Sequence, residues 1–209
     1  YSYLLLENRY RGSEEEIKRR ISFYTEIFPK SDLPIVEIGP GRGELLQVFS
    51  EHGIKAYGVE LDHAMVLRSR EKGLDIREGD GIAHLATLPD KSISGVIATQ
   101  VIEHLTQNQL KELLALCKAK VKAGGRVVFE TINSESMVAL AHHYFRDPTH
   151  VAPLHPDTMK FVMEMAGFKV LEVRKLSPFD EGAQFRLIPT EDYMTPRWVE
   201  TVGRINQNF

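Results

Sequence analysis

Three glycines at alternate positions, Gly39, Gly41 and Gly43, follow a short apolar run, and Glu37 stands two residues before the first of them. Glycines at such a place let the backbone turn tightly and approach a ligand closely. A dinucleotide-binding fingerprint of the form G-x-G-x-x-G would have its third glycine at position 44, but that residue is Glu44. The acid ahead of the glycines disfavours a pyrophosphate and favours a ligand that carries positive charge.

Two further carboxylates follow the glycines at nearly equal intervals. Glu60 comes 21 residues after Gly39, and Asp80 comes 20 residues after Glu60. A carboxylate at the first of these places can accept hydrogen bonds from both hydroxyl groups of a ribose. A carboxylate at the second can accept a hydrogen bond from the exocyclic amine of an adenine ring. A surface acid or a helix-capping acid is the alternative for each.

The histidines are concentrated in one part of the chain. Five of the eight lie between positions 104 and 155, namely His104, His142, His143, His150 and His155. A histidine titrates near pH ~6.5, so it can take a proton from a hydroxyl group at neutral pH. His104 and His150 are the candidates for a general base. A supporting or capping role for His104 and a turn-stabilising role for His150 are the alternatives.

Short apolar runs alternate with helical patterns along most of the chain. We predict strands over 35–38, 56–59, 74–77, 95–99, 126–130 and 168–174, and a turn over 122–125. We predict helices over 44–52, 62–72, 106–120 and 156–166. This alternation is typical of βαβ units, and it predicts an α/β three-layer sandwich with a mostly parallel sheet. Ligands of such sheets bind at the carboxyl ends of the strands, where the glycines and the acids stand.

A helix is expected ahead of the first strand. Ser13 and Glu16 form a capping box, and the apolar stripe that follows predicts a helix to about residue 28. The stripe consists of Ile17, Ile21, Tyr24 and Phe28. The acids and bases between these positions are expected to form a solvated helix face, with i,i+4 pairs such as Glu14 with Lys18.

The motifs at the strand ends, in this order and spacing, resemble those of class I S-adenosylmethionine-dependent methyltransferases over residues from about 30 to 175. The resemblance implies a Rossmann-like sheet, the cofactor S-adenosylmethionine and the transfer of its methyl group. It implies that Glu37, Gly39, Gly41 and Gly43 surround the methionine part of the cofactor. It further implies contacts to the ribose from Glu60 and Leu61, to the adenine from Asp80, Gly81 and Ile82, and near the methyl group from Gln100 and Val101.

Two segments carry a narrower resemblance. Residues 10–13 and 144–156 are similar to segments of bacterial methyltransferases that accompany glycosyltransferases in making surface polysaccharides. This implies a sugar hydroxyl as methyl acceptor, and fusion to or association with a glycosyltransferase or a kinase. It also implies that Arg11 reaches the carboxylate of the cofactor, with an ordinary surface arginine as the alternative. We expect a cytoplasmic protein that reaches the inner face of the membrane through its partners.

A metal-assisted reaction is the competing interpretation. The pair Glu103-His104, followed later by His150, resembles the magnesium site of small-RNA 2′-O-methyltransferases and of ubiquinone-pathway O-methyltransferases. Those sites have a further glutamate three residues before the pair, where this chain has Gln100, a poor ligand for magnesium. We therefore expect no metal. If one binds, its ligands are Glu103, His104 and His150, and the acceptor is a small molecule or RNA.

Composition excludes several classes of protein. The 26 Lys and Arg and 29 Asp and Glu give a formal net charge of −3, which argues against charge-driven binding of nucleic acid. The single Cys117 excludes a disulfide framework and a cysteine-based zinc site, and suits a reducing cytosol. No apolar run reaches the ~18 residues that a membrane span needs, and no signal peptide is visible. A catalytically silent methyltransferase-like module and a nicotinamide-dependent oxidoreductase are the alternatives from other classes.

The length of 209 residues predicts one domain. We expect an N-terminal helical cap over 1–30, a cofactor-binding core over 31–175 and a C-terminal extension of the same domain over 176–209. In the extension, Trp198, Val202 and Ile205 predict a helix, and Phe185 to Ile188 is too short for a strand. We therefore expect the strand that closes the sheet to lie beyond residue 209. The initial Tyr1 favours a chain that is trimmed or part of a longer protein.

Overall fold

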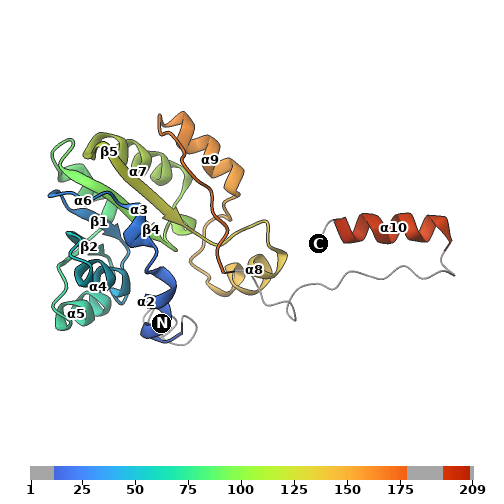
Figure 1. Ribbon diagram of the computed structural model, residues 1–209, viewed down its shortest axis with the longest axis horizontal. Coiled ribbons are helices and arrows are strands. Elements are labelled where there is room, and N and C mark those ends of the chain that lie inside the picture. Colours follow the sequence, from blue (N-terminus) through green and yellow to red (C-terminus); the bar gives the residue numbers. More distant parts are fainter. Residues whose placement is uncertain (1–11, 178–194, 208–209) are drawn as a thin grey trace. The chain divides into compact units, whose positions relative to one another are not determined.

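The computed structural model describes residues 12–177 and 195–207 (Figure 1). The chain divides into two compact units, Tyr1–Val173 and Arg174–Phe209. The first unit contains the sheet and nearly all the expected site residues. Within the described part of the second unit, the regular element is helix α10 (Pro196–Gln207), which the apolar spacing of the tail had predicted. No helix among the described residues has both the length and the apolar character that crossing a membrane requires.

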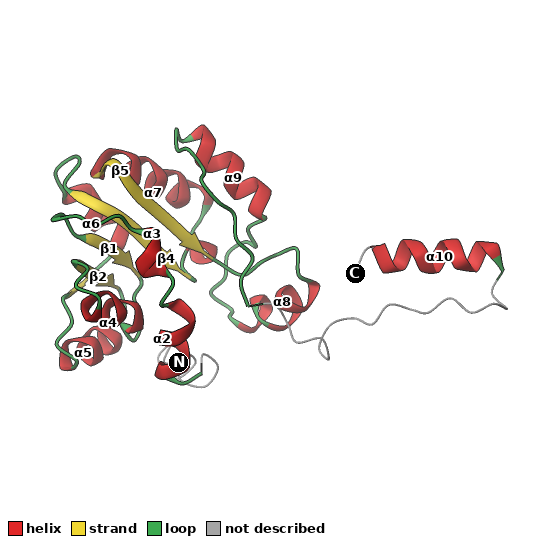
Figure 2. Cartoon of the chain, viewed as in Figure 1, coloured by secondary structure: helices red, strands yellow, loops and turns green. Residues whose placement is uncertain are grey.

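A parallel sheet forms the centre of the first unit, and its strands lie in the order β3-β2-β1-β4-β5 (Figure 2). The strands are β1 (Ile35–Ile38), β2 (Ala56–Glu60), β3 (Ile76–Glu78), β4 (Ile93–Thr99) and β5 (Val121–Glu130). Every residue of β1 and six of the seven residues of β4 are buried, as expected for central strands that are covered on both faces. The predicted α/β sandwich is confirmed, and the described sheet is open.

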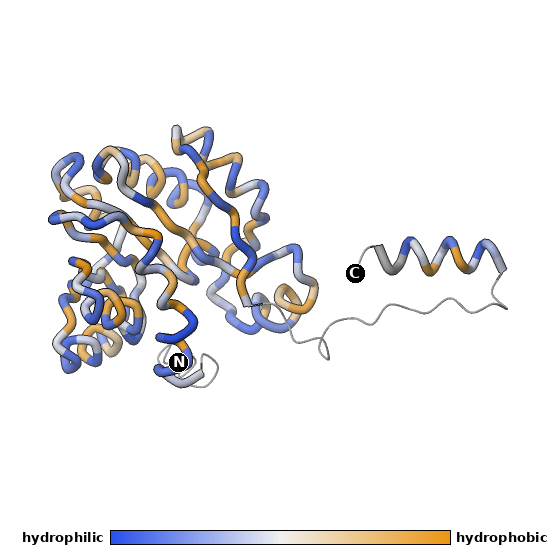
Figure 3. Tube along the Cα trace, in the orientation of Figure 1, coloured by the Kyte–Doolittle hydropathy of each residue, from blue (hydrophilic) through white to orange (hydrophobic). Residues whose placement is uncertain are grey.

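Helices cover both faces of this sheet (Figure 1). They are α2 (Glu14–Ile21), α3 (Tyr24–Ile27), α4 (Glu44–Glu51), α5 (His63–Glu71), α6 (Gly81–Thr87), α7 (Gln107–Lys120) and α9 (Pro156–Met165). On one face α2, α3 and α4 form an apolar cluster around Phe49, which is fully buried. On the other face α6, α7 and α9 form a second cluster that contains Leu85, Leu113 and Met159. Hydrophobic segments run along the strands, whereas the helices alternate hydrophobic and hydrophilic residues (Figure 3).

The N-terminal helical segment differs from its prediction in two ways. The capping box of Ser13 and Glu16 is present, but the helix breaks into α2 and α3, and the Ser22 hydroxyl donates to the Arg19 carbonyl at this break, 3.0 Å away. The acids do not all face solvent, because Glu14 pairs with Arg68 and Lys72 of α5, at 2.6 and 2.8 Å. The apolar stripe is buried as predicted. The cap is therefore joined to the sheet layer by packing and by charge.

Strand β5 begins earlier than predicted, at Val121, so residues 122–125 are not a turn. The pairing with β4 is shifted at this place, between Ile93 and Gly95. Gly124 has a φ of +75°, and a Cβ on Gly125 would lie 2.4 Å from the Ser94 carbonyl oxygen. The two glycines therefore serve an irregular start of the strand, where a backbone approach is close.

Residues 168–174, predicted as a sixth strand, do not join the described sheet, whose edge is β5. A strand is stable when its backbone is paired and one of its faces is covered. Leu171 and Val173 of this segment are 61% and 53% exposed, so neither condition is met by the described residues. Residues 185–188 lie outside the part of the chain that the structure describes. The expectation of a closing strand beyond residue 209 stays a prediction.

Candidate functional site

The expected site residues that the structure describes lie around the carboxyl ends of the strands. The strand order reverses direction between β1 and β4, since β2 follows on one side and β5 on the other. At such a point the loops after the two central strands diverge and leave room for a ligand. The glycines follow β1, and Gln100, Val101 and the short 3-10 helix η1 (Ile102–His104) follow β4.

The glycine loop needs its glycines for conformation and for space. Gly39, Gly41 and Gly43 have φ values of +65°, +56° and +78°, a region that other residues seldom occupy. A Cβ on Gly39 would lie 2.6 Å from a methyl group of Val101, and one on Gly43 would lie 2.4 Å from Leu74. The glycine loop is thus tightly packed against Val101, in the loop after β4.

The two strand-end glutamates are buried beside this loop. Glu37 is 2% exposed and Glu60 is 9% exposed. Glu60 accepts hydrogen bonds from the backbone amides of Gly41 and Asp62, at 3.0 and 2.9 Å, which links the end of β2 to the glycine loop. Burying two carboxylates at the ends of neighbouring strands costs free energy unless a cation or hydrogen-bond donors accompany them. Their positions therefore suit a ligand that offers hydroxyl groups and positive charge.

The other four residues expected near the ribose and adenine have different surroundings. Asp80 is exposed and is the N-cap of α6, because its carboxylate accepts from the Ala83 amide at 2.7 Å. Gly81 is buried, and a Cβ there would lie 2.5 Å from Ile38. Ile82 packs in the apolar cluster that α6, α7 and α9 form on one face of the sheet, whereas Leu61 is 71% exposed. Asp80 thus caps a helix, the alternative role for this acid, while its second carboxylate oxygen remains a hydrogen-bond acceptor.

Gln100 adopts an unusual backbone conformation at the end of β4, with a φ of +57°. Its backbone amide donates to the Glu130 carbonyl at 2.8 Å, and its side-chain amide donates to the Glu130 carboxylate at 3.1 Å. The same carboxylate accepts a hydrogen bond from the buried hydroxyl of Tyr24 in α3. Backbone strain of this kind costs ~1–3 kcal/mol and is concentrated at functional sites. Glu130 and Tyr24 therefore fix the strained residue next to the glycine loop.

This network was not expected from the sequence, although a signal for Glu130 was present. Glu130 ends the strand β5 as Glu60 ends β2, so the search for acids at strand ends applies to it equally. Burial and the neighbouring Glu130 carboxylate raise the pKa of Tyr24 well above its usual value. Tyr24 therefore stays protonated and acts as a hydrogen-bond donor. No sequence pattern distinguished it from the other apolar positions of its helix.

A second set of polar residues lies just beyond Gln100. One ligand atom from each of Glu103, His104 and His150 lies within 4.8 Å of the others. The rings of His104 and His150 are 4.6 Å apart, and His150 also stacks on Tyr144 at 4.6 Å. The structure therefore brings together the three residues that the sequence had linked. They come from η1 and from a loop more than forty residues later.

Both histidines are oriented by hydrogen bonds at Nδ1. Nδ1 of His150 lies 2.6 Å from the Tyr144 carbonyl oxygen, and Nδ1 of His104 lies 2.9 Å from the Thr149 hydroxyl. A carbonyl oxygen can only accept, so Nδ1 of His150 carries a proton and Nε2 of the neutral ring has a lone pair. Burial and the neighbouring His150 lower the pKa of His104, and Asp147 and a hydrogen bond to the Thr149 backbone act against them. His104 is therefore a neutral imidazole at neutral pH, the form that can accept a proton.

Glu103 is the most buried member of this set, with 1% of its surface exposed. Burial raises the pKa of its carboxyl group to about 7, although the Glu103 backbone and the Thr131 hydroxyl act in the opposite direction. Neither carboxylate oxygen has a hydrogen bond of normal geometry among the described residues. At neutral pH this buried acid is near the midpoint of its titration, a property that is concentrated at functional sites.

Replacing Glu103 with glutamine is expected to remove a pH dependence of stability. The folded-state pKa of about 7 lies above the ordinary value of 4.5, so between these values the folded state binds a proton that the unfolded state has lost. The free energy of unfolding of the natural chain should therefore fall as the pH rises from about 5 to about 7, and level off above. Relative to it, Glu103→Gln should gain roughly 2–4 kcal/mol over this range.

Chemical denaturation at pH 5, 6, 7 and 8 measures this difference. The exposed Glu71 of α5 provides the control, since Glu71→Gln should follow the natural chain at every pH. Parallel pH profiles for Glu103→Gln and the natural chain would contradict the assignment of a raised pKa to Glu103.

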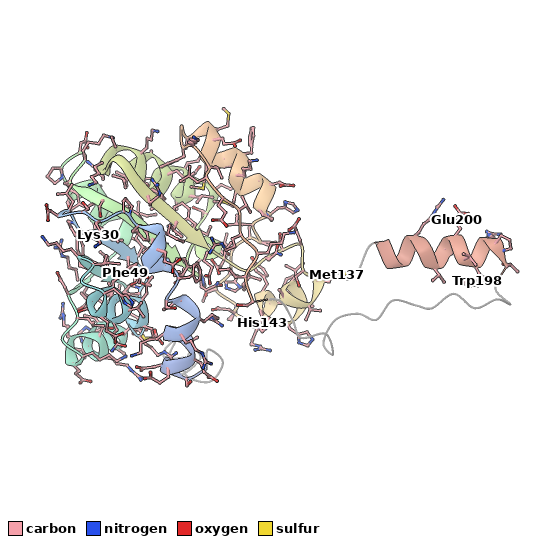
Figure 4. All side chains as sticks on the ribbon, viewed as in Figure 1. Lys30, Phe49, Met137, His143, Trp198 and Glu200 are labelled. Atoms are coloured by element: carbon pink, nitrogen blue, oxygen red, sulfur yellow. The ribbon has the colours of Figure 1, made fainter. Side chains whose placement is uncertain are left out.

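The other residues considered from the sequence lie outside the set formed by Glu103, His104 and His150. Arg11 lies outside the described residues, but the guanidinium group of Arg42 in the glycine loop donates to the carbonyl of the neighbouring Gly12. His142 and His143 lie at the end of α8 (Met137–His142), where Figure 4 labels Met137 and His143. His155 is the N-cap of α9, where its side chain accepts from the Asp157 amide. Glu44, which distinguishes the loop from a dinucleotide fingerprint, is buried and pairs with Arg42 at 2.6 Å.

Known methyltransferases match this chain in sequence and in fold. A family model for a methyltransferase domain matches residues 7–173. A crystal structure of a SAM-dependent methyltransferase from Archaeoglobus fulgidus has a TM-score of 0.83 and 34% sequence identity, and the match covers 100% of this chain and 91% of that one. The similarity therefore extends over the whole described fold.

Two curated relatives match part of the chain. An uncharacterized methyltransferase of Geobacillus sp. (strain WCH70) is 30% identical over 56% of this chain and 58% of its own length. A ubiquinone biosynthesis O-methyltransferase of Stutzerimonas stutzeri is 26% identical over 61% of this chain and 56% of its own length. The chain thus spans somewhat more than half the length of these relatives. From the family model and the Archaeoglobus structure, the chain belongs to the family of S-adenosylmethionine-dependent methyltransferases.

Proposed function

We propose that the chain is an O-methyltransferase that transfers the methyl group of S-adenosylmethionine to a hydroxyl group of a sugar or a surface polysaccharide. The observation that carries the proposal is the pair of adjacent histidine rings, His104 and His150, beside Gln100 and Val101 at the carboxyl end of β4. A hydroxyl acceptor must lose a proton during the reaction, and an imidazole is a suitable base at neutral pH. The methyltransferase fold itself implies that S-adenosylmethionine is the cofactor.

The residues at the sheet edge fit this cofactor. When bound, it supplies a methyl group on a positively charged sulfur atom. The glycine loop accepts a closely packed group without a clash of Cβ atoms, and the buried acids Glu37 and Glu60 compensate positive charge and accept from hydroxyl groups. Asp80 offers a carboxylate oxygen to the adenine amine, and Gln100 and Val101 line the end where the methyl group is transferred. The histidines then take the proton of the acceptor hydroxyl.

The sugar class is supported by the loop that carries His150. The loop resembles that of methyltransferases which act beside glycosyltransferases, and it presents Phe145, which is 72% exposed, next to Tyr144. A sugar ring has an apolar face and a polar rim, and an exposed aromatic ring beside hydrogen-bonding groups suits both. On the same resemblance we propose that the chain works with a glycosyltransferase or a kinase, at the cytoplasmic face of the inner membrane.

Transfer of a labelled methyl group tests the proposed function. The chain is incubated with methyl-labelled S-adenosylmethionine and a panel of glycans that end in different sugars, and the products are separated by mass spectrometry. Label in an ether-linked methyl group of a sugar is the expected result, and glycans whose terminal hydroxyls are blocked serve as the control. Label on amines alone, or on no hydroxyl in the panel, would contradict the proposal.

A metal-assisted reaction on a small molecule or RNA is the second candidate. It is favoured by the arrangement of Glu103, His104 and His150, whose ligand atoms lie within 4.8 Å of one another, and by the relative from ubiquinone biosynthesis. Two imidazoles and one carboxylate suit a transition metal better than magnesium, which prefers oxygen ligands.

A chelator distinguishes the two candidates. Under the leading proposal, treatment with a chelator leaves the rate of methyl transfer unchanged, because the histidines act as bases without a metal. Under the second candidate, the treated chain loses activity and regains it when one divalent ion is added. Cofactor binding, measured in parallel by calorimetry, should be unaffected in both cases, since the glycine loop and the acids on β1 and β2 hold the cofactor.

A further inference from the structure

The loop that follows α8 contributes more than His150 to the site. Its residues Asp147 and Thr149 form a short hydrogen-bonded chain that ends on His104. The Thr149 hydroxyl lies 2.6 Å from a carboxylate oxygen of Asp147 and 2.9 Å from Nδ1 of His104. The Thr149 backbone amide donates to the same Asp147 oxygen at 2.9 Å. Asp147 and His104, 43 residues apart, are thus connected through one side-chain oxygen.

The direction of each hydrogen bond in this chain follows from the number of protons available. The Thr149 backbone amide can only donate, and it ends on the same Asp147 oxygen as the Thr149 hydroxyl, so that oxygen is the acceptor in both bonds. The single proton of the Thr149 hydroxyl therefore points to Asp147. The hydroxyl oxygen is then an acceptor toward His104, and Nδ1 of His104 must carry a proton. In the neutral ring the lone pair is consequently on Nε2.

We propose that Asp147 and Thr149 are positioning residues that hold His104 in the tautomer with a proton on Nδ1, so that Nε2 is the atom that accepts the hydroxyl proton. The proposal deepens the proposed function and rests on it for the role of His104 as base. It assigns a role to two residues that were not among the expected site residues. His150 has the same tautomer through a different partner, the Tyr144 carbonyl.

The proton balance of the step is complete with these groups. The bond between sulfur and the methyl carbon breaks, the bond between the acceptor oxygen and that carbon forms, and the sulfur becomes a neutral thioether. The hydroxyl proton moves to Nε2 of His104, which becomes an imidazolium. Its positive charge is adjacent to the hydrogen-bonded Thr149 and Asp147, and the carboxylate compensates that charge without taking the proton itself. The proton then leaves to solvent.

Backbone contacts fix the geometry of this chain. The Val151 amide donates to the Glu103 carbonyl at 2.9 Å, which anchors the loop to η1 on the far side of Thr149. Pro148, between Asp147 and Thr149, has a φ fixed by its ring, which limits the conformations of the loop. The hydroxyl of Thr149 is therefore held between its two partners although the residue is exposed. An exposed residue with two fixed hydrogen bonds can be replaced without disturbing the core.

The tautomer of His104 can be measured directly, without any acceptor. Long-range proton–nitrogen spectra of the chelator-treated chain, labelled with nitrogen-15, distinguish a proton on Nδ1 from one on Nε2. The expected result is a proton on Nδ1 in the natural chain and in Thr149→Ser, which keeps the hydroxyl. Thr149→Val should shift His104 toward the other tautomer. A proton on Nε2 in the natural chain, or an unchanged tautomer in Thr149→Val, would overturn the proposal.

Turnover supplies the second readout. Thr149→Val should lower kcat by about 10- to 100-fold, the usual effect of losing an orienting partner, with little change in the KM for the cofactor. Thr149→Ser should restore most of the rate, and Asp147→Asn should lower it, because an amide in place of the carboxylate can donate to Thr149 and reverse the chain. Thr201→Val on α10 removes a hydroxyl that donates to a backbone carbonyl and serves as the matched control.

The two readouts separate the proposal from the function on which it rests. If the tautomer is as expected but no hydroxyl acceptor is methylated, the proposed function is wrong while the role of Thr149 in orienting His104 stands. If a hydroxyl is methylated but Thr149→Val retains both the tautomer and kcat, the positioning role is wrong. Thermal unfolding of each variant shows whether the chain remains folded, and equal loss of stability and rate in Thr149→Ser would also count against the proposal.

Discussion

Replacing His104 with alanine is expected to lower the turnover number for methyl transfer by about 10²- to 10⁴-fold, the range found for the loss of a general base. Affinity for S-adenosylmethionine should change little, since the residues expected to bind the cofactor lie on β1, β2, α6 and the loop after β4. His150→Ala should act in the same direction. The two rings are 4.6 Å apart, so the loss of either one changes the surroundings of the other.

The surroundings of the two rings explain why turnover should fall while the affinity for the cofactor is kept. His104 is partly buried, its pKa is lowered by burial and by His150, and its Nδ1 is bound to Thr149. The Nδ1 of His150 is bound to the Tyr144 carbonyl at 2.6 Å. Each ring is therefore oriented through its Nδ1, as in the orienting arrangement of a catalytic triad.

The chain offers a matched control for the histidine variants. His52 makes the same contact as His150, with Nδ1 2.8 Å from the Val48 carbonyl oxygen, but it lies at the end of α4, far from the strand ends that form the site. His52→Ala should keep both turnover and cofactor affinity. Steady-state rates and calorimetric cofactor binding, measured on all three variants, decide the matter. Equal losses of turnover and affinity in His104→Ala would indicate a structural role for that histidine.

The conformation of the glycine loop and the placement of the strand-end acids were predictable from sequence because their signals are local. A glycine that requires a positive φ, such as Gly39, and an acid that ends a strand, such as Glu60, act through a few neighbouring residues. Their spacing along the chain therefore predicts which residues lie together at the carboxyl ends of the strands. Helix α6 was missed because it is short and starts directly at Asp80, whose capping role was only the alternative.

The contacts around Gln100 and His104 were only partly predictable because they are long-range. Tyr24 reaches Glu130 from a helix ahead of the sheet, and Asp147 reaches His104 through Thr149. Such pairs leave no periodic pattern in the sequence. The predicted strand over 168–174 is wrong for a related reason, since a strand depends on a partner, and the described residues provide none.

Replacing Gly39 with alanine is expected to weaken cofactor binding by at least about tenfold, which corresponds to ~1.4 kcal/mol. Two costs act at this position. The φ of +65° is unfavourable for a residue with a Cβ by ~1–2 kcal/mol. The added Cβ would also lie 2.6 Å from the nearest methyl group of Val101, so Val101 or the loop must move. Val101 is expected to line the cofactor near its methyl group, so its movement changes the shape of the binding surface.

Gly53 separates these two costs. Its φ of +66° is nearly the same, but a Cβ there would meet nothing within 4 Å, and it lies at the opposite edge of the sheet, before β2. Gly53→Ala should therefore lower the free energy of unfolding by ~1–2 kcal/mol and leave cofactor affinity unchanged. Gly39→Ala should lower both. Calorimetric titration with S-adenosylmethionine and chemical denaturation provide the two quantities for each variant.

The comparison isolates the close approach of the glycine loop from its conformation. Because the two variants have similar backbone strain, a loss of cofactor affinity confined to Gly39→Ala would place the effect at the glycine loop, where the added Cβ meets Val101. A Gly39→Ala variant that binds the cofactor as tightly as Gly53→Ala would show that this contact can relax without reaching the cofactor. Glu37, Glu60 and Asp80 would then carry the binding, and the glycines would serve only the turn from β1 into α4.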